Sequence, residues 1–376
     1  LHDALPIWIV LAFLLCLDRV KLVYSLFFAL TLSVQFQTQH YQVIFYTAIL
    51  LFAIGITPLV KDLLQKRYAL FFGRISLLGL ALLFSVLSTA WPLLPAKKYN
   101  EDTIRAKWAL DISKGKTTEP RKSGVDPEFI KNWSMAPREF LDFVVPRASG
   151  GTMSENYTGK EVPELTGQIV PAYWGDLMFS GSLLYLGIPV LLSLLALLRF
   201  RNRMVAGLSL TALILALWAL GMNFRPFYQL CYDILPFFKN FRTPPASLTV
   251  VYFILPVLSA YGLNVLLDKE NSENKAFRKK ILVVLAAFIG AGLIFYLLGD
   301  LFSFTRNHEN FDAQVIPQFR KIRRAFYFSD VNRYMIFASL FALTGAAFIF
   351  RWVRREVALL GVCALVTVDL AAIQMR

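Results

Sequence analysis

The sequence has few charged residues for its length. Asp, Glu, Lys and Arg make up 17% of the 376 residues, and 57% are hydrophobic, whereas roughly a quarter of a typical soluble domain is charged. Such a chain is not disordered, and its composition argues against a soluble enzyme. Acidic residues are fewer than basic ones, 25 against 39, which gives a formal net charge of +14. Because the basic residues stand in short clusters between apolar runs, the charge does not indicate a nucleic-acid partner.

Residues and motifs of metal, redox or phosphate chemistry are also scarce. The three cysteines, Cys16, Cys231 and Cys363, lie far apart, with neither metal-ligand spacing nor an evident disulfide framework. The sequence contains no phosphate-cradling glycine loop, nucleophile elbow or zinc motif. Candidate functional residues are therefore isolated side chains and local clusters.

Apolar runs of membrane-spanning length are abundant. About 20 apolar residues cross a bilayer as an α-helix, and we predict nine full spans at residues 22–34 (extended to 39), 41–60, 69–94, 177–198, 204–222, 248–267, 281–301, 334–353 and 357–375. Residues 7–17 form a partial span. The chain starts at Leu1 and stops at Arg376, directly after an apolar segment, so we expect a fragment truncated at both ends. The predicted fold is all-α transmembrane, a polytopic helical bundle.

Every second connection between these spans is basic. Cytoplasmic loops are enriched in Lys and Arg, so the connections at residues 19–21, 61–67, 199–203, 269–280 and 351–355 are predicted to be cytoplasmic. The others then face outward. The longest, residues 95–176, is predicted as an extracytoplasmic insertion between N-terminal helices (1–94) and C-terminal helices (177–376). Within it, apolar periodicity over residues 128–145 predicts an amphipathic helix.

The first outward turn contains His40 in the sequence QTQHYQ (residues 37–42), with Tyr46 further into the next span. Such a cluster at a cavity mouth can hydrogen-bond a sugar or a phosphate, and a neutral imidazole can act as a base near neutral pH. Interfacial His and Tyr are also common at span ends. A turn that only contacts lipid headgroups is therefore the favoured interpretation.

The sequence AYWGD (residues 172–176) leads into the span predicted at 177. Trp and Tyr are common interfacial anchors, and an Asp at a helix start stabilises the positive end of the helix. The functional alternative is that Asp176 orients a sugar hydroxyl while Trp174 stacks on the sugar ring. The structural interpretation is favoured over it.

The outward loop 223–247 combines cations with aromatic residues. It contains Arg225, Lys239 and Arg242, followed by Pro244 and Pro245. This pattern predicts a rigid connection that is partly inserted in the membrane. Arg242 could bind the phosphate of a lipid-linked substrate bidentately, or it could extend to headgroup phosphates; the two readings have equal weight.

Two further features carry charge near the C-terminus. Arg320, Lys321, Arg323 and Arg324 form a cluster that is predicted to face outward. A solvated helical face is favoured there over binding of anionic lipid or polymer. Asp369, inside the last predicted span, is a functional candidate by default, discounted because it lies towards the hydrated outer end.

Several short stretches follow one another in a characteristic order. They are residues 38–42 with Tyr46, 103–105, 124–126, 133–134, Pro137, Glu139, Pro146, 150–151, 173–176 with Tyr185 and Gly187, and 241–242. In these stretches the chain resembles the YfhO-like bacterial multi-pass membrane proteins. The resemblance runs from about residue 35 to residue 267, and beyond that only hydropathy and residues 368–370 support it.

The resemblance implies a C-type glycosyltransferase in the bacterial cytoplasmic (inner) membrane, with its active site at the outer face. The implied donor is a polyprenyl-phosphate-linked sugar, and the acceptor is a cell-envelope glycopolymer or lipid. A carboxylate would deprotonate the acceptor hydroxyl while cations stabilise the departing phosphate. In such enzymes the main catalytic carboxylate lies in the first outer loop. That loop would precede Ile7, so we expect this carboxylate to lie outside the fragment.

Within the fragment, the resemblance implies supporting roles. Arg225 and Arg242 are predicted to bind phosphate, while His40, Gln42, Glu139, Trp174 and Asp176 are predicted to shape the sugar or acceptor site. Related enzymes can use a divalent metal, but no ligand cluster here demands one.

Two other functions fit the sequence. A transporter or flippase of lipid-linked saccharides should show broken spans or polar residues near the bilayer midplane, and the predicted spans are mostly uninterrupted. A non-catalytic envelope assembly protein would bind a carrier lipid without turnover. In each case membrane lipids are partners, and nucleic acid is not.

Overall fold

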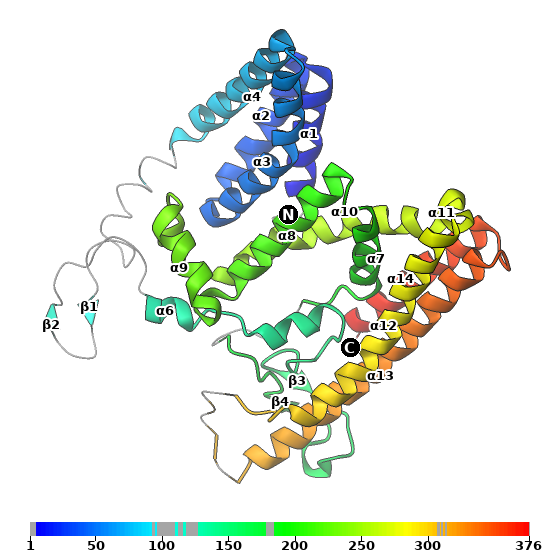
Figure 1. Cartoon of the computed structure of the whole chain (residues 1–376). Helices are drawn as coiled ribbons and strands as arrows, with labels where there is room; N and C mark the ends of the chain where they lie inside the picture. Colours follow the sequence, from blue (N-terminus) through cyan, green and yellow to red (C-terminus); the bar gives the residue numbers. More distant parts are fainter. Residues whose placement is uncertain are drawn as a thin grey trace. The chain divides into compact units, whose positions relative to one another are not determined.

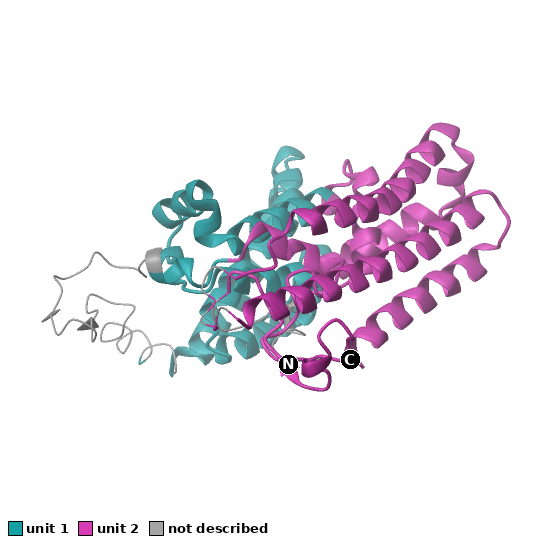
Figure 2. Cartoon of the chain, turned by 90° about the horizontal axis from the view of Figure 1, so that it is seen from below, with its two compact units in different colours: residues 1–134, 206–254 teal, residues 135–205, 255–376 magenta. Residues whose placement is uncertain are grey.

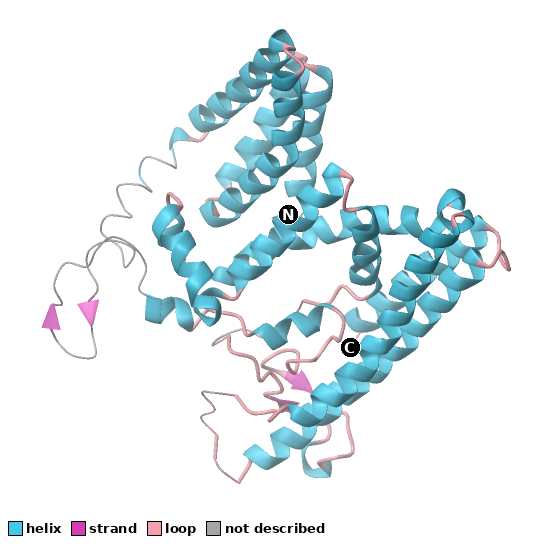
Figure 3. Cartoon of the chain, in the orientation of Figure 1, coloured by secondary structure: helices cyan, strands magenta, loops and turns pink. Residues whose placement is uncertain are grey.

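The computed structural model describes residues 5–91, 95, 110–111, 116–117, 127–177, 184–306, 309, 311–312 and 314–375. Most of these residues are helical (Figure 3). The described strands form two short antiparallel pairs, β1 (Leu110–Asp111) with β2 (Lys116–Thr117) and β3 (Glu155–Asn156) with β4 (Ile169–Val170). The predicted helical class is therefore confirmed. The family-like stretches 103–105 and 124–126, and most of the predicted insertion before residue 127, lie outside the described residues.

Six helices in the described part of the chain are long and apolar enough to cross a membrane. They are α3 (Tyr41–Leu64), α4 (Tyr68–Ser88), α10 (Leu248–Leu267, extended back to Pro244 by η6), α12 (Lys275–Leu301), α13 (Ile316–Ile349) and α14 (Arg355–Gln374). A seventh crossing results if α8 (Arg203–Ala219) and the segment Gly221–Ile234, which meet at a bend of 111°, form one broken span. The structure therefore supports a multi-pass membrane protein. The predicted count of nine full spans is not confirmed.

Two of the predicted spans are short helices in the structure. After α1 (Leu5–Arg19), α2 (Leu22–Gln37) has 16 residues, and α7 (Ile188–Ala196) continues only through the 3₁₀ turn η3 (Leu197–Arg199). Within the span predicted at 177–198, residues 184–187 are not helical and α7 begins only at Ile188, while residues 178–183 lie outside the described part of the chain. Gly187, with φ 61°, has a backbone conformation that favours glycine, and Pro189 occupies the first turn of α7, where proline is well tolerated.

The start of α7 is held by a buried acidic residue. Asp369 of α14 is fully buried, and its carboxylate accepts hydrogen bonds from the Ile188 N–H (3.3 Å) and the Tyr185 hydroxyl (2.5 Å). It also forms a 2.9 Å ion pair with Arg333 of α13. A carboxylate stabilises the positive N-terminal end of a helix, so Asp369 has a clear structural role.

The described helices group into two compact units, each made of two chain segments (Figure 2). Unit 1 comprises Leu1–Ser134 and Ala206–Ile254, and unit 2 comprises Met135–Val205 and Leu255–Arg376. In unit 1, α2 packs along α1 and α4. An aromatic cluster joins α3, α8 and the segment after α9 (Arg225–Ile234) through Phe45, Tyr46, Trp218, Phe238 and Phe241. This cluster fixes the connection that carries Arg242.

In unit 2, the main core lies between α7, α12, α13 and α14. The helices α12 and α13 run side by side (Figure 1). Because α13 begins at Ile316, much of the loop predicted at residues 302–333 is helical. The periodic burial of Phe319, Ile322 and Phe326 explains this extension, since these side chains form one face that packs against a cluster formed by Tyr157, Val162, Val170 and Ala172.

The basic cluster on α13 is only partly solvated. Arg320, Lys321 and Arg324 are exposed, as predicted, but Arg323 is 1% exposed, so the prediction is wrong for this residue. Its guanidinium donates to three backbone carbonyls, those of Ala172 (3.1 Å), Phe304 (3.0 Å) and Pro171 (3.0 Å), and pairs with Glu309 over 2.7 Å. Arg323 therefore ties two loop segments to α13.

Candidate functional site

The candidate site of unit 2 is built on a short 3₁₀ helix, η1 (Pro137–Phe143). The amphipathic helix predicted over residues 128–145 is wrong, because the structure breaks it into α6 (Pro127–Lys131) and η1. Pro137 supplies the physical reason, since the residue before a proline is disfavoured in helical conformation and Ala136 is extended. The break places Arg138 and Glu139 at the start of η1.

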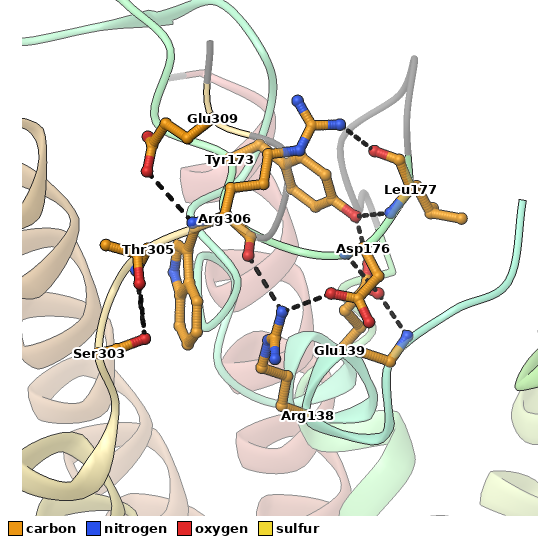
Figure 4. A network of polar contacts seen from close by, with 11 residues as sticks. Arg138, Glu139, Tyr173, Asp176, Leu177, Ser303, Thr305, Arg306 and Glu309 are labelled. Carbon is orange, nitrogen blue, oxygen red and sulfur yellow. Dashed lines mark hydrogen bonds and ion pairs between the residues drawn. The ribbon is translucent and has the colours of Figure 1, made fainter. Parts of the chain in front are cut away.

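Glu139 accepts three hydrogen bonds in the centre of this site (Figure 4). The donors are the N–H of Ala136 (2.6 Å), the Tyr173 hydroxyl (2.6 Å) and the N–H of Asp176 (3.3 Å). Glu139 is fully buried, and this burial raises the pKa of its carboxyl, although the three hydrogen bonds oppose the shift. In this arrangement Glu139 positions the 173–176 segment and has no exposed surface for a substrate.

Tyr173 links Glu139 to the next residues of the chain. Its hydroxyl donates to Glu139 and accepts from the N–H of Leu177 over 2.9 Å. Burial and the neighbouring carboxylate both raise the pKa of Tyr173, so the phenol stays protonated and keeps donating. The Glu139 carboxylate and the Tyr173 phenol together fix this segment, since Glu139 binds Tyr173 at its start and Tyr173 binds the Leu177 N–H at its end.

Arg138 and Asp176 form the accessible part of the site. Arg138 Nη2 donates to Asp176 Oδ1 over 2.7 Å and to the Trp174 carbonyl over 3.2 Å (Figure 4). The two side chains are 28% and 20% exposed. Arg138 Nε and Trp174 Nε1 are buried and have no hydrogen-bond partner in the described part of the chain. The pair is therefore held in place and remains partly exposed.

The indole of Trp174 is packed rather than open. It is 2% exposed, its ring lies 5.4 Å from that of Phe302 and 5.2 Å from that of Phe304, and the Arg138 guanidinium lies 4.9 Å from its centroid. Stacking on a sugar ring stays a prediction and would require the indole to leave these neighbours. Its role in this structure is to support Arg138 by a cation–π contact.

A second arginine, Arg306, holds the other end of the same segment. Arg306 Nη2 donates to the Leu177 carbonyl over 2.6 Å, and its guanidinium lies 5.6 Å from the Tyr173 ring centroid. Its own N–H donates to Glu309 over 3.2 Å (Figure 4). The sequence reasoning missed both Arg138 and Arg306. Arg138 stands beside the singled-out Glu139, but nothing local marks Arg306.

The remaining predicted site residues belong to unit 1. Gln42 Nε2 donates to the Thr243 carbonyl over 2.6 Å and to the Tyr46 hydroxyl over 2.9 Å, so it joins α3 to the connection that carries Arg242. His40 directly precedes α3, and Arg225 begins α9. His40, Arg225 and Arg242 are exposed. The seven predicted residues thus form two groups, with Glu139, Trp174 and Asp176 in unit 2 and the other four in unit 1.

The described residues contain no group of three or more His, Cys, Asp or Glu side chains that could hold a metal ion. Family models, curated proteins and solved structures show no match to the chain. Any functional assignment therefore rests on the residues and geometry above.

Proposed function

We propose that the protein is a membrane glycosyltransferase of the bacterial cytoplasmic membrane that moves a sugar from a polyprenyl-phosphate carrier to a cell-envelope acceptor. The observation that carries this proposal is the Arg138–Asp176 pair, a cation and a carboxylate that are rigidly held and partly exposed. The pair offers a donor for phosphate oxygens and an acceptor for sugar hydroxyls. The multi-pass helices supply the apolar surroundings that a polyprenyl chain requires.

The exposure of this pair distinguishes it from the other ion pairs that the structure describes in unit 2. Arg147–Asp330, Arg323–Glu309 and Arg333–Asp369 have buried carboxylates, whereas Arg324–Asp300 and Arg351–Glu273 are largely exposed. Buried pairs serve the fold, and exposed pairs are loosely held. Arg138–Asp176 alone among these described pairs combines a fixed framework with access for a ligand.

The proposed reaction is a direct displacement at the anomeric carbon. The acceptor oxygen forms a bond to that carbon as a carboxylate takes its proton, and the bond from the carbon to the carrier phosphate breaks. Arg138 binds the polar headgroup, and Asp176 accepts hydrogen bonds from the sugar. The proposed phosphate roles of Arg225 and Arg242, and the proposed sugar contacts of His40 and Gln42, concern unit 1.

Binding of a lipid-linked sugar tests the proposal separately from turnover. Purified protein in lipid nanodiscs would be titrated with polyprenyl-phosphate-linked glucose, using Asp176→Asn, Arg138→Gln and, as a matched control, Arg324→Gln from the exposed pair Arg324–Asp300. The first two variants should bind at least about tenfold more weakly, because each removes a charge-assisted hydrogen bond, and the control should bind as wild type. Equal binding in all four proteins would overturn the role of the pair.

A transporter or flippase of lipid-linked saccharides is the second candidate, and two observations favour it. The α8–α9 pair is broken by a 111° bend, and the short helix α7 begins at the buried Asp369–Arg333 pair. Discontinuous helices and intramembrane ion pairs are typical of transporters. Reconstituted vesicles separate the functions, since a flippase moves the carrier between leaflets without cleaving it. Binding with neither movement nor cleavage would indicate an assembly protein.

A further inference from the structure

The helix α9 (Arg225–Ile234) has three distinct faces. Tyr228 and Cys231 are buried, with the Tyr228 ring 5.2 Å from that of Phe238 and the Cys231 thiol accepting a 2.9 Å hydrogen bond from Trp218 Nε1. These contacts fix the helix on unit 1. Its other two faces are available to the surroundings.

One of these available faces is apolar and the other is polar. Leu230 and Ile234, one helical turn apart, are 56% and 68% exposed. Gln229 and Asp233, also one turn apart, lie on the polar face, where the Gln229 amide donates to the Asp233 carboxylate over 3.1 Å. A helix with adjoining apolar and polar faces matches the gradient at a membrane surface, where one side contacts acyl chains and the other contacts water.

Phe237, shortly after α9, adds exposed apolar surface at a conformational cost. Phe237 has φ 65°, in the left-handed region that a bulky residue rarely adopts, and its ring is 71% exposed. The neighbouring Phe238 is 1% exposed. The backbone therefore turns so that one phenylalanine joins the core and the other faces outward. We define Leu230, Ile234 and Phe237 as the apolar strip.

Two exposed cations flank the apolar strip in the sequence, and α8 precedes it. Arg225 and Arg242, at either end of this part of the chain, are exposed and complement the phosphates of lipid headgroups. α8 and α9 meet at a bend of 111°, and together they have the length and apolar composition of a broken membrane span or a re-entrant segment. A bend this sharp turns α9 away from the axis of α8, so that α9 can run along the bilayer surface where α8 enters the bilayer.

We propose that α9 lies in the headgroup layer of the bilayer, with the apolar strip inserted at the acyl boundary and with Arg225 and Arg242 at lipid phosphates. The loop that the sequence predicts at this place is thus a membrane-surface anchor built on a helix. The anchor holds the connection around Arg242 at the depth of headgroups. This inference does not depend on the proposed transferase activity, because bulk phospholipid is the partner.

Site-directed spin labelling measures the depth of each face directly. Cys363 is the exposed native thiol, and Cys16 and Cys231 are buried, so Cys363→Ser provides the background for single Leu230→Cys and Asp233→Cys labels. The protein would be reconstituted in phosphatidylcholine vesicles with about a quarter phosphatidylglycerol. Relaxation by dioxygen, which concentrates in acyl chains, is compared with relaxation by the water-soluble nickel complex NiEDDA.

The proposal expects the oxygen-to-nickel accessibility ratio to be at least about threefold higher at position 230 than at 233, since the two faces meet acyl chains and water respectively. Labels at Ile234→Cys and Phe237→Cys should follow position 230, and they replace it if that variant does not fold. Equal ratios would show a water-exposed helix. Shielding from both reagents would show a covering protein segment, and spin–spin broadening would show a second copy. Each of these three results overturns the proposal.

Discussion

The Tyr173 hydroxyl donates a 2.6 Å hydrogen bond to the fully buried carboxylate of Glu139. Through it, a residue of η1 controls a segment more than thirty positions later in the chain. The same carboxylate accepts the N–H of Asp176, so the orientation of the proposed substrate-binding carboxylate depends on a side chain that is itself inaccessible. Glu139 is thus a positioning residue, and its substitution should act first on stability.

Replacing Glu139 should destabilise the protein in proportion to the hydrogen bonds that are lost. Glu139→Ala leaves three buried donors without acceptors and should lower the free energy of unfolding by about 3 kcal/mol or more. Glu139→Gln keeps a carbonyl oxygen for the two N–H groups and loses only the acceptor of the Tyr173 hydroxyl, at a cost of about 1 kcal/mol. Thermal unfolding in detergent micelles ranks the variants, and equal costs would contradict the positioning role.

The same residue should make stability depend on pH. Burial raises the folded-state pKa of Glu139 above its ordinary value of 4.5, so between these two values the folded state binds more protons than the unfolded state. The contribution of Glu139 to stability is therefore largest below pH 4.5 and is lost as the pH rises through the raised pKa. Glu139→Gln cannot titrate, so the melting temperature of wild type minus that of the variant should fall from about pH 4 to about pH 7. A melting-temperature difference that stays constant over this pH range would refute the proposed titration of Glu139.

Arg323 and Arg324 are adjacent on α13 and make a matched pair. Arg323 is 1% exposed and serves three carbonyls and Glu309, whereas Arg324 and its partner Asp300 are 59% and 65% exposed. Arg323→Gln should cost about 3–5 kcal/mol, because it leaves a buried carboxylate and carbonyls unpaired. Arg324→Gln should change stability by less than about 0.5 kcal/mol. Similar melting temperatures for both variants would show that Arg323 does not tie the two loop segments to α13.

Hydropathy predicts the helical, multi-pass character of the chain because the cost of burying polar groups in a bilayer depends on composition, which is local. It does not predict where a helix begins inside an apolar run, as the non-helical residues 184–187 before α7 show. The start of α7 is marked in the sequence by Gly187, which precedes the helix, and by Pro189 in its first turn. Helix-start residues of this kind locate the beginning of a helix better than hydropathy alone.

The site could be predicted only in part, for a related reason. The AYWGD sequence predicts Trp174 and Asp176 as candidate site residues, because aromatic and acidic residues near a span end form a local sequence pattern. Arg306 and Arg323 act on backbone carbonyls of Leu177 and Ala172, which are distant in sequence. Because every residue has a backbone carbonyl, the sequence does not indicate which carbonyl an arginine will bind. Such contacts can be identified only in the folded chain.

Gly187→Ala should disrupt the start of α7. The backbone conformation of Gly187, with φ 61° and ψ −128°, costs an L-residue about 1–3 kcal/mol, and a Cβ here would also collide with the Asp369 carboxylate and lie 2.6 Å from the Tyr185 hydroxyl. Relief of the collision would break the hydrogen bonds that Asp369 makes to Tyr185 and Ile188. We therefore expect a total loss of about 3 kcal/mol or more.

The control for this change is Gly290→Ala in α12, where a Cβ would meet no atom within 4 Å. Alanine is favoured over glycine within a helix, so this variant should be neutral or more stable by up to about 1 kcal/mol. Thermal unfolding compares the two substitutions under the same conditions. If Gly187→Ala is as stable as its control, the α7 start tolerates an ordinary residue, and the placement of the Asp369 carboxylate against Ile188 is wrong. If only Gly187→Ala is destabilised, and by more than the roughly 1–3 kcal/mol that its backbone conformation costs, the collision with Asp369 accounts for the excess.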